Sequence, residues 1–319
     1  MIFEKQVVNG YKAMMHTRYD NTELSFYFSH KDFEGFEREE YAFNSSMGHT
    51  LQGYLYYYKD FNEDRLIVFD HGLGNGHRAY MREIEKLCSH GYRVFAYDHT
   101  GCMESGGAST NGMAQSLCAL NDCLATIQAD KRFAGLDISV VGHSWGAFST
   151  LNIAALHPHV SHIVAMSGFV SIDEMMKTFF AGPLKGYRKA VLELERSANP
   201  KFSTFNAVES LKNSNVKALL IYSANDQLCR RIHYDILKAG LEDKENVHFM
   251  LVQNKGHNPN YTENAVKLLD KFKKDREKFA KKKNTTKEEK QQFLKSFDWV
   301  SMTEQDEAVW QQIFAHLDN

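Results

Sequence analysis

The sequence has no long apolar run, and none of its apolar stretches approaches the 18 residues of a transmembrane helix. Residues 1–6 lack the charged and then apolar stretch of a secretion signal, so we expect no leader. The five cysteines are odd in number and have no metal-site spacing, which predicts reduced thiols in a cytoplasmic protein. A net charge of −2 gives no basic excess, so we expect no nucleic-acid partner.

What the chain does contain is ordinary globular composition, with 43% hydrophobic and 24% charged residues among 319. This length suits one large domain with an insertion, or two smaller domains. Apolar runs of strand length alternate with helical segments, which favours an α/β architecture. We predict strands at 39–45, 50–58, 65–70, 92–97, 136–141, 161–168, 216–222 and 247–252.

The most informative stretch is Gly142-His143-Ser144-Trp145-Gly146, which has the pattern Gly-x-Ser-x-Gly. It follows the apolar run 138–141 and precedes a helical segment, 147–156. Strand, tight turn and helix in this order are typical of a nucleophile elbow. The turn strains the serine and lifts its hydroxyl above the sheet, while the two glycines let neighbouring backbone approach. Ser144 is therefore the candidate nucleophile.

Two later strands end in residues that would complete a catalytic triad with Ser144. Asp226 follows the predicted strand 216–222, where an orienting carboxylate is expected. His257 follows the last predicted strand, 247–252, in a Gly-His pair. The chain order serine, acid, histidine matches that of elbow-type hydrolases.

The glycine-rich stretch His71-Gly72-Leu73-Gly74 comes directly after the predicted strand 65–70. Its glycines would let the backbone turn and expose N–H groups, either as a phosphate cradle or as an oxyanion hole. The spacing matches neither a P-loop nor a dinucleotide fingerprint, which favours the oxyanion hole. We expect the backbone N–H groups of Leu73 and Trp145 to form it.

Strand–helix alternation is interrupted between about 171 and 214, where amphipathic segments carry Met175 and Phe179. We interpret this insertion as a helical cap over the active site, with two ordinary packing helices as the alternative. We expect the cap and the neighbouring loops to form a substrate pocket lined by His71, Gly72, His143, Met175 and Phe179.

The two ends of the chain are harder to interpret. We expect residues 1–37 to be an N-terminal extension that packs on the core, and 38–277 to be the main domain. We expect residues 278–319 to form a helical tail that packs on the body and is not needed to complete the fold core. This amphipathic tail could also cover the pocket or form a homodimer contact. The Lys-rich segment 270–290 predicts a solvated face, with a membrane-surface or anionic-ligand patch as the alternative.

Over residues 38–275 the chain resembles the α/β-hydrolase superfamily, in particular the branch of monoacylglycerol lipases, lysophospholipases and carboxylesterases. The resemblance implies a mostly parallel central sheet flanked by helices, with a helical cap. The chain departs from the family's pattern at Cys102-Met103, in the loop after Asp98. Triad chemistry needs no cofactor, so we expect none. The resemblance rests on His71-Gly72-Leu73-Gly74, Asp98-x-x-Gly101-x-x-x-Ser105-Gly106, Gly142-His143-Ser144-Trp145-Gly146, Asp226 and Gly256-His257.

These observations predict a serine hydrolase that cleaves a carboxylic ester, either a small acyl ester or a lipid resembling monoacylglycerol or lysophospholipid. Peptidase, thioesterase and acyltransferase activities would use the same triad, and a non-catalytic binding protein is a further alternative. His71 and His77 alone do not indicate zinc, because no third ligand has a recognisable spacing, so we expect no metal.

Overall fold

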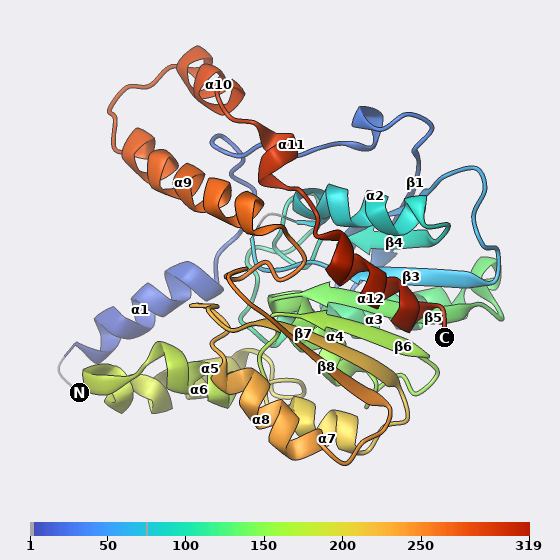
Figure 1. The fold of residues 1–319 in the computed structure, drawn as a ribbon. Helices are drawn as coiled ribbons and strands as arrows, with labels where there is room; N and C mark the ends of the chain where they lie inside the picture. Colours follow the sequence, from blue (N-terminus) through green and yellow to red (C-terminus); the bar gives the residue numbers. More distant parts are fainter. Residues whose placement is uncertain (1–2, 75) are drawn as a thin grey trace.

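The computed structural model describes residues 3–74 and 76–319. In these residues, one eight-stranded sheet runs in the order β1-β2-β4-β3-β5-β6-β7-β8 (Figure 1). β2 is antiparallel to both β1 and β4, and all later neighbours are parallel. The strands are β1 (Glu37–Asn44), β2 (Thr50–Tyr57), β3 (Arg65–Asp70), β4 (Arg93–Tyr97), β5 (Asp137–His143), β6 (His162–Met166), β7 (Lys217–Ser223) and β8 (Val247–Val252).

The central strands are nearly continuous apolar runs because helices cover both faces of the sheet. Successive residues of β3 point into opposite cores. Leu66 and Val68 join the larger core, and Ile67 and Phe69 join the smaller one. All eight predicted strands are present, with bounds within about two residues of those expected from the sequence.

The larger core lies under α3, α4, α7 and α8, and the smaller core under α2 and α12. This gives a three-layer arrangement with the carboxyl ends of the parallel strands at one edge of the sheet. The helices are α2 (Met81–Ser89), α3 (Gln115–Ala129), α4 (Trp145–Ile153), α7 (Ala207–Lys212), α8 (Ile232–Leu241) and α12 (Glu307–Leu317), with short 3-10 turns η1 (His30–Asp32), η2 (His77–Tyr80) and η3 (Lys131–Phe133).

The last helix of the C-terminal tail packs on the sheet and contributes to the fold core, which the sequence predicts to be complete without it. α12 packs against β6 (Figure 1), and its Trp310 is fully buried in the smaller core, which also contains Ile221 and Val164. The amphipathic pattern of this segment was visible in the sequence, but the sheet face that it covers was not. The last helix of the tail thus belongs to the body of the domain.

The cap is assembled from two distant parts of the chain. α5 (Ile172–Phe179), η4 (Gly182–Tyr187) and α6 (Arg188–Ala198) lie between β6 and β7, and α1 (Glu4–Met15) packs on η4 and α6 (Figure 1). Buried Glu195 joins the parts, since it accepts hydrogen bonds from Tyr11 Oη (2.7 Å) and Met113 N (2.8 Å). The cap therefore includes α1 of the N-terminal extension, while α7, inside the expected insertion 171–214, packs on α4 and α8 as a body helix.

Between β8 and α12 the chain makes a helical excursion that extends away from the sheet (Figure 1). Its core is aromatic: Phe272 and Phe297 meet edge to face at 4.9 Å, and Trp299 stacks on Phe26 at 5.0 Å. Within 3–74 and 76–319, no helix combines the length and apolarity needed to cross a membrane. The excursion consists of α9 (Glu263–Ala280), α10 (Lys287–Lys295) and α11 (Trp299–Met302).

Candidate active site

Ser144 stands at the sharp turn between β5 and α4, with φ 58° and ψ −113°. A residue other than glycine rarely adopts this backbone conformation, so the structure on both sides of Ser144 must hold the turn in place. The flanking glycines permit it: a Cβ on Gly146 would lie 2.0 Å from the carbonyl oxygen of Asp70, and one on Gly142 would lie 2.2 Å from Thr150 Oγ1. The backbone N–H of Ser144 donates to the carbonyl of Met166 at 2.8 Å.

The structure brings Ser144, His257 and Asp226 together from three different loops. His257 Nε2 lies 2.8 Å from Ser144 Oγ, and His257 Nδ1 lies 2.7 Å from Asp226 Oδ2. A carboxylate accepts, so Nδ1 carries the proton and Nε2 is free to accept one from the serine hydroxyl. Asp226 is 3% exposed, and its other oxygen accepts from the backbone N–H groups of Leu228 and Cys229.

The loops that carry Asp226 and His257 are tied to each other by side chains at the end of β7, which accept from backbone N–H groups after β8. Asn225 Oδ1 accepts from the backbone N–H of Gly256 at 3.0 Å, and Ser223 Oγ accepts from that of Lys255 at 3.1 Å. These bonds fix the distance between acid and base without using the triad atoms themselves.

A second hydrogen-bond chain runs behind the serine through Tyr80, which sequence reasoning missed. The backbone N–H of Gly72 donates to Tyr80 Oη at 3.1 Å, and Tyr80 Oη lies 2.9 Å from His143 Nδ1. His143 Nε2 lies 2.7 Å from the carbonyl oxygen of His257 and must donate to it. Burial, and then the nearby His257, lower the pKa of His143 to about 3, which keeps this ring neutral.

The two backbone groups expected to bind an oxyanion flank the serine. Trp145 is the first residue of α4, so its N–H is one of those without a partner inside the helix. Leu73 and Trp145 line the same cavity as Ser144, and Gly72 approaches the serine so closely that a Cβ there would lie 3.3 Å from Ser144 Cβ. The positive end of the α4 dipole is directed at the same point.

These residues open into a mostly apolar cavity of about 280 Å³ under the cap. Four of the five predicted pocket residues, Gly72, His143, Met175 and Phe179, line it. His71 does not, because it is fully buried beneath the loop, where its Nε2 accepts from the backbone N–H of His99 at 2.9 Å. The cavity wall consists of Met14, Met15, Gly72, Leu73, Tyr80, Met113, His143, Ser144, Trp145, Phe169, Met175, Phe179, Leu228, Cys229 and His257.

Several wall residues had no signal in the sequence. Met14 and Met15 come from α1, which lies far from the triad along the chain and reaches the cavity only through its packing on the cap. Tyr80 belongs to a short 3-10 turn that matches no motif. In the part of the chain that the structure describes, no group of three or more His, Cys, Asp or Glu side chains is arranged to hold a metal ion.

A model of the alpha/beta hydrolase fold family matches residues 65–215, which include the glycine-rich loop and the elbow. The chain has the α/β-hydrolase fold, and over residues 65–215 it is similar to this family. This match does not identify a branch of the family, because the similar proteins described below differ in their named activities.

Among curated proteins, a Mycobacterium phage D29 protein named as a candidate non-heme haloperoxidase is 33% identical over 96 residues. The match covers 29% of this chain and only 32% of that protein, so the matched part spans about a third of the relative's length.

Among solved structures, a Pyrococcus furiosus esterase has a TM-score of 0.60 at 19% identity, covering 89% of this chain and 98% of that one. A Pyrococcus horikoshii acylaminoacyl peptidase has a TM-score of 0.55 at 17% identity, covering 80% and 43%. Likeness at these identities establishes the shared fold. The reaction has to be argued from the site.

Proposed function

We propose that this α/β-hydrolase cleaves carboxylic esters with Ser144 as nucleophile, His257 as general base and Asp226 as the residue that orients His257. The observation that carries the proposal is the placement of His257 within hydrogen-bond distance of both partners, 2.8 Å and 2.7 Å. An isolated serine hydroxyl is a weak nucleophile, and a neighbouring base of this geometry activates it.

In the proposed reaction, Ser144 Oγ attacks the ester carbonyl while its proton passes to His257 Nε2. The C–O bond to the alcohol then breaks, and His257 returns the proton to the departing oxygen. Water repeats the sequence on the acyl-enzyme and releases the acid. The N–H groups of Leu73 and Trp145 stabilise the negative oxygen in both halves, an effect of about 2.7–4 kcal/mol for each donor.

The shape of the cavity favours a short apolar acyl group over a long lipid chain. Its volume of about 280 Å³ is small for a ligand cavity, and methionines and aromatic rings dominate its wall. Unbranched methionine side chains adapt to chains of slightly different length. A monoacylglycerol-like or lysophospholipid-like ester would need the cap helices to move apart.

Hydrolysis of p-nitrophenyl esters from acetate to palmitate tests the proposal. We expect a maximum at short to medium chains for the wild type, and a loss of at least about 10⁴-fold in kcat for Ser144→Ala, which leaves the fold intact. Ser89→Ala, an exposed serine at the end of α2, is the matched control and should keep full activity.

Labelling by a fluorophosphonate separates the remaining alternatives. Reaction at Ser144 without hydrolysis of any ester would redirect the assignment to amides, peptides or thioesters. Ester hydrolysis that persists in Ser144→Ala would overturn the proposal, and so would a serine that neither reacts with the probe nor cleaves esters.

A further inference from the structure

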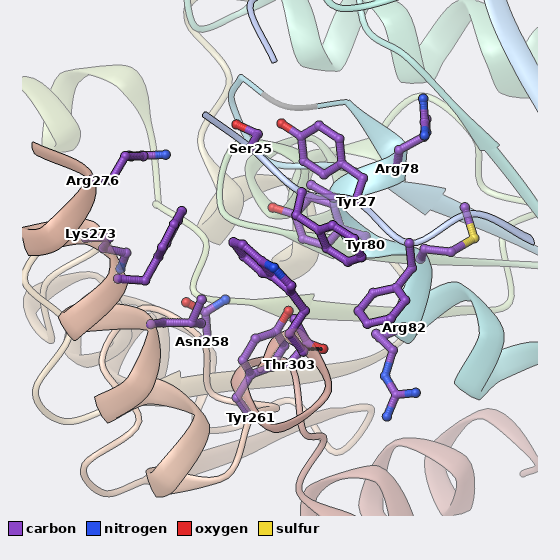
Figure 2. Close-up of a pocket in the computed structure, with 17 residues that line it drawn as sticks. Ser25, Tyr27, Arg78, Tyr80, Arg82, Asn258, Tyr261, Lys273, Arg276 and Thr303 are labelled. Carbon is purple, nitrogen blue, oxygen red and sulfur yellow. Dashed lines mark hydrogen bonds between the residues drawn. The ribbon is translucent and has the colours of Figure 1, made fainter. Parts of the chain in front are cut away.

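A second cavity, of about 270 Å³, is drawn in Figure 2 and shares Tyr80 with the catalytic cavity. We call it the basic cavity. One of its walls is α9, which contributes Lys273 and Arg276, and across from them lie Tyr27 and Tyr80 (Figure 2). Residues of α11 and of the loop that follows His257 complete the floor. The mechanism proposed above uses none of the charged side chains of this cavity.

The charges that line the basic cavity have one sign. Arg78, Arg82, Lys273 and Arg276 contribute to its wall, which contains no Asp or Glu. The chain as a whole carries a net charge of only −2, so this concentration of cations is local. An unneutralised group of cations facing a concave surface attracts anions from solution.

The same cations are little used inside the protein. Within 3–74 and 76–319, no carboxylate forms a salt bridge with Arg78, Arg82 or Arg276. Lys273 pairs with Asp270 at 3.3 Å, but both side chains are more than half exposed, which makes the pair weak. Arg276 instead lies over the ring of Phe272, with its guanidinium carbon 5.6 Å from the ring centroid.

The cations of the basic cavity also shift the pKa values of two nearby side chains, Tyr27 and His143. Burial raises the pKa of the Tyr27 hydroxyl, the charges of Arg276 and Arg78 oppose this rise, and that of Asp98 adds to it. The charge of Lys273 contributes, after burial and His257, to the lowered pKa of His143. The basic cavity is therefore close enough to influence the triad side of the molecule.

Aromatic rings fill the rest of the wall. Phe272 and Trp299 meet edge to face at 4.8 Å, and Phe26 stacks on Trp299. Such rings suit a flat or aliphatic body, while guanidinium groups suit a carboxylate or phosphate. Tyr80 lines this cavity and the catalytic one, and Asn258, on the floor, directly follows His257.

We propose that the basic cavity binds a carboxylate or phosphate group carried on a small apolar body. The anion can belong to a separate ligand or to the ester itself, since Tyr80 is the partition between the two cavities. The recognition chemistry is the same in both cases, namely charge-assisted hydrogen bonds from Arg78, Lys273 and Arg276 with aromatic contact around them.

Calorimetric titration of full-length Ser144→Ala with phenyl phosphate tests the site independently of hydrolysis. We expect phenyl phosphate to bind at least about tenfold more tightly than phenol, and Arg276→Gln and Arg78→Gln each to weaken it about tenfold. Lys274→Gln makes the same charge change on an exposed face of α9 outside the cavity and should change binding less than about twofold. Equal binding of phenol, or an equal effect of Lys274→Gln, would overturn the proposal.

Esterase kinetics with the charged ester 4-acetoxybenzoate and the neutral ester phenyl acetate distinguish an anion that is part of the substrate from one on a separate ligand. If the charged ester is preferred and Arg276→Gln removes only that preference, the anion is part of the substrate. If phenyl phosphate binds but the charged ester has no advantage, the site serves a separate anion. If phenyl phosphate binds but no ester is cleaved, the proposed function is wrong and the anion site is supported. If esters are cleaved but phenyl phosphate does not bind, the anion site is wrong and the proposed function is supported.

Discussion

Tyr80 and His143 are joined by a hydrogen bond of 2.9 Å in which the phenol is the donor. The direction follows from the other side of the ring, where His143 Nε2 donates to the carbonyl of His257. Tyr80 also accepts from the backbone N–H of Gly72. The hydroxyl thus connects the glycine-rich loop to His143, the residue before the serine, and the His143 ring continues the chain to the loop of the base.

Tyr80→Phe removes this connection while keeping the ring. We expect kcat to fall about tenfold with little change in KM, because the loop and the base lose their alignment but the cavity keeps its shape. Loss of the hydroxyl should also cost about 1–2 kcal/mol in the free energy of unfolding. Steady-state kinetics on p-nitrophenyl butyrate and urea unfolding measure the two effects.

Tyr58→Phe is the matched control, since the Tyr58 hydroxyl donates to Glu85 away from the active site. It should leave kcat unchanged. If Tyr80→Phe lowered stability and kept kcat, the hydroxyl would support the fold alone, and its role as a positioning residue would be rejected.

The elbow makes a strong prediction about Gly146. A Cβ there would meet the Asp70 carbonyl oxygen at 2.0 Å, and backbone cannot move aside as a flexible side chain can. Gly146→Ala should therefore lower the free energy of unfolding by about 3 kcal/mol or more and abolish fluorophosphonate labelling of Ser144.

Gly10→Ala provides the contrast, because nothing lies within 4 Å of a Cβ at this position of α1. It should raise stability by about 0.5–1 kcal/mol, since alanine favours the helix. A Gly146→Ala protein as stable and as reactive as the wild type would show that the elbow has more room than the backbone implies.

The sequence predicted the sheet and the juxtaposition of Ser144, Asp226 and His257 because both depend on local patterns. Apolar runs mark the strands, and parallel strands deliver their carboxyl ends to one edge, so residues that follow them meet there. The glycine pattern around Ser144 adds the turn. None of these signals requires knowledge of distant contacts.

Three contacts that sequence reasoning missed are long-range. Trp310 has an obvious apolar helix around it, yet only the folded chain shows that it closes the smaller core. Met15 lines the cavity because α1 packs on a cap formed by residues 172–198, far away along the chain. His71 is in the expected loop, but the direction of its side chain, inward beneath the loop, depends on His99.

The tail also supports the loop of the proposed base through a buried polar network. Gln305 Oε1 accepts from Asn260 Nδ2 and from Trp310 Nε1, both at 2.8 Å, and Asn260 lies three residues after His257. Gln305→Leu would leave the indole N–H buried without its acceptor. We expect a loss of about 2–4 kcal/mol in the free energy of unfolding, with a lower kcat.

Urea unfolding and p-nitrophenyl butyrate kinetics check this expectation. Gln311→Leu makes the same chemical change on the exposed face of α12 and should alter neither stability nor kcat appreciably. If Gln305→Leu destabilised the fold but kept full kcat below its melting temperature, the tail would support the body without supporting the base.

The acid sensitivity of the fold has an identifiable source where α12 meets the sheet. Here His316 packs edge to face on His162 at 5.4 Å and on His248 at 6.2 Å. Burial, followed by the charges of these two neighbours, lowers the pKa of His316 to about 4, and Lys217 adds a positive charge beside His162.

Because the folded pKa lies below the unfolded value of 6.5, the unfolded chain binds more protons between these two pH values. The stability from a neutral His316 is therefore complete above about pH 6.5 and is lost as the pH falls toward 4. At pH 5 the loss from this group is about 2 kcal/mol. In His316→Leu, urea unfolding between pH 7 and pH 5 should give a correspondingly shallower fall in the free energy of unfolding than in the wild type. Parallel curves for the two proteins would place the acid sensitivity elsewhere.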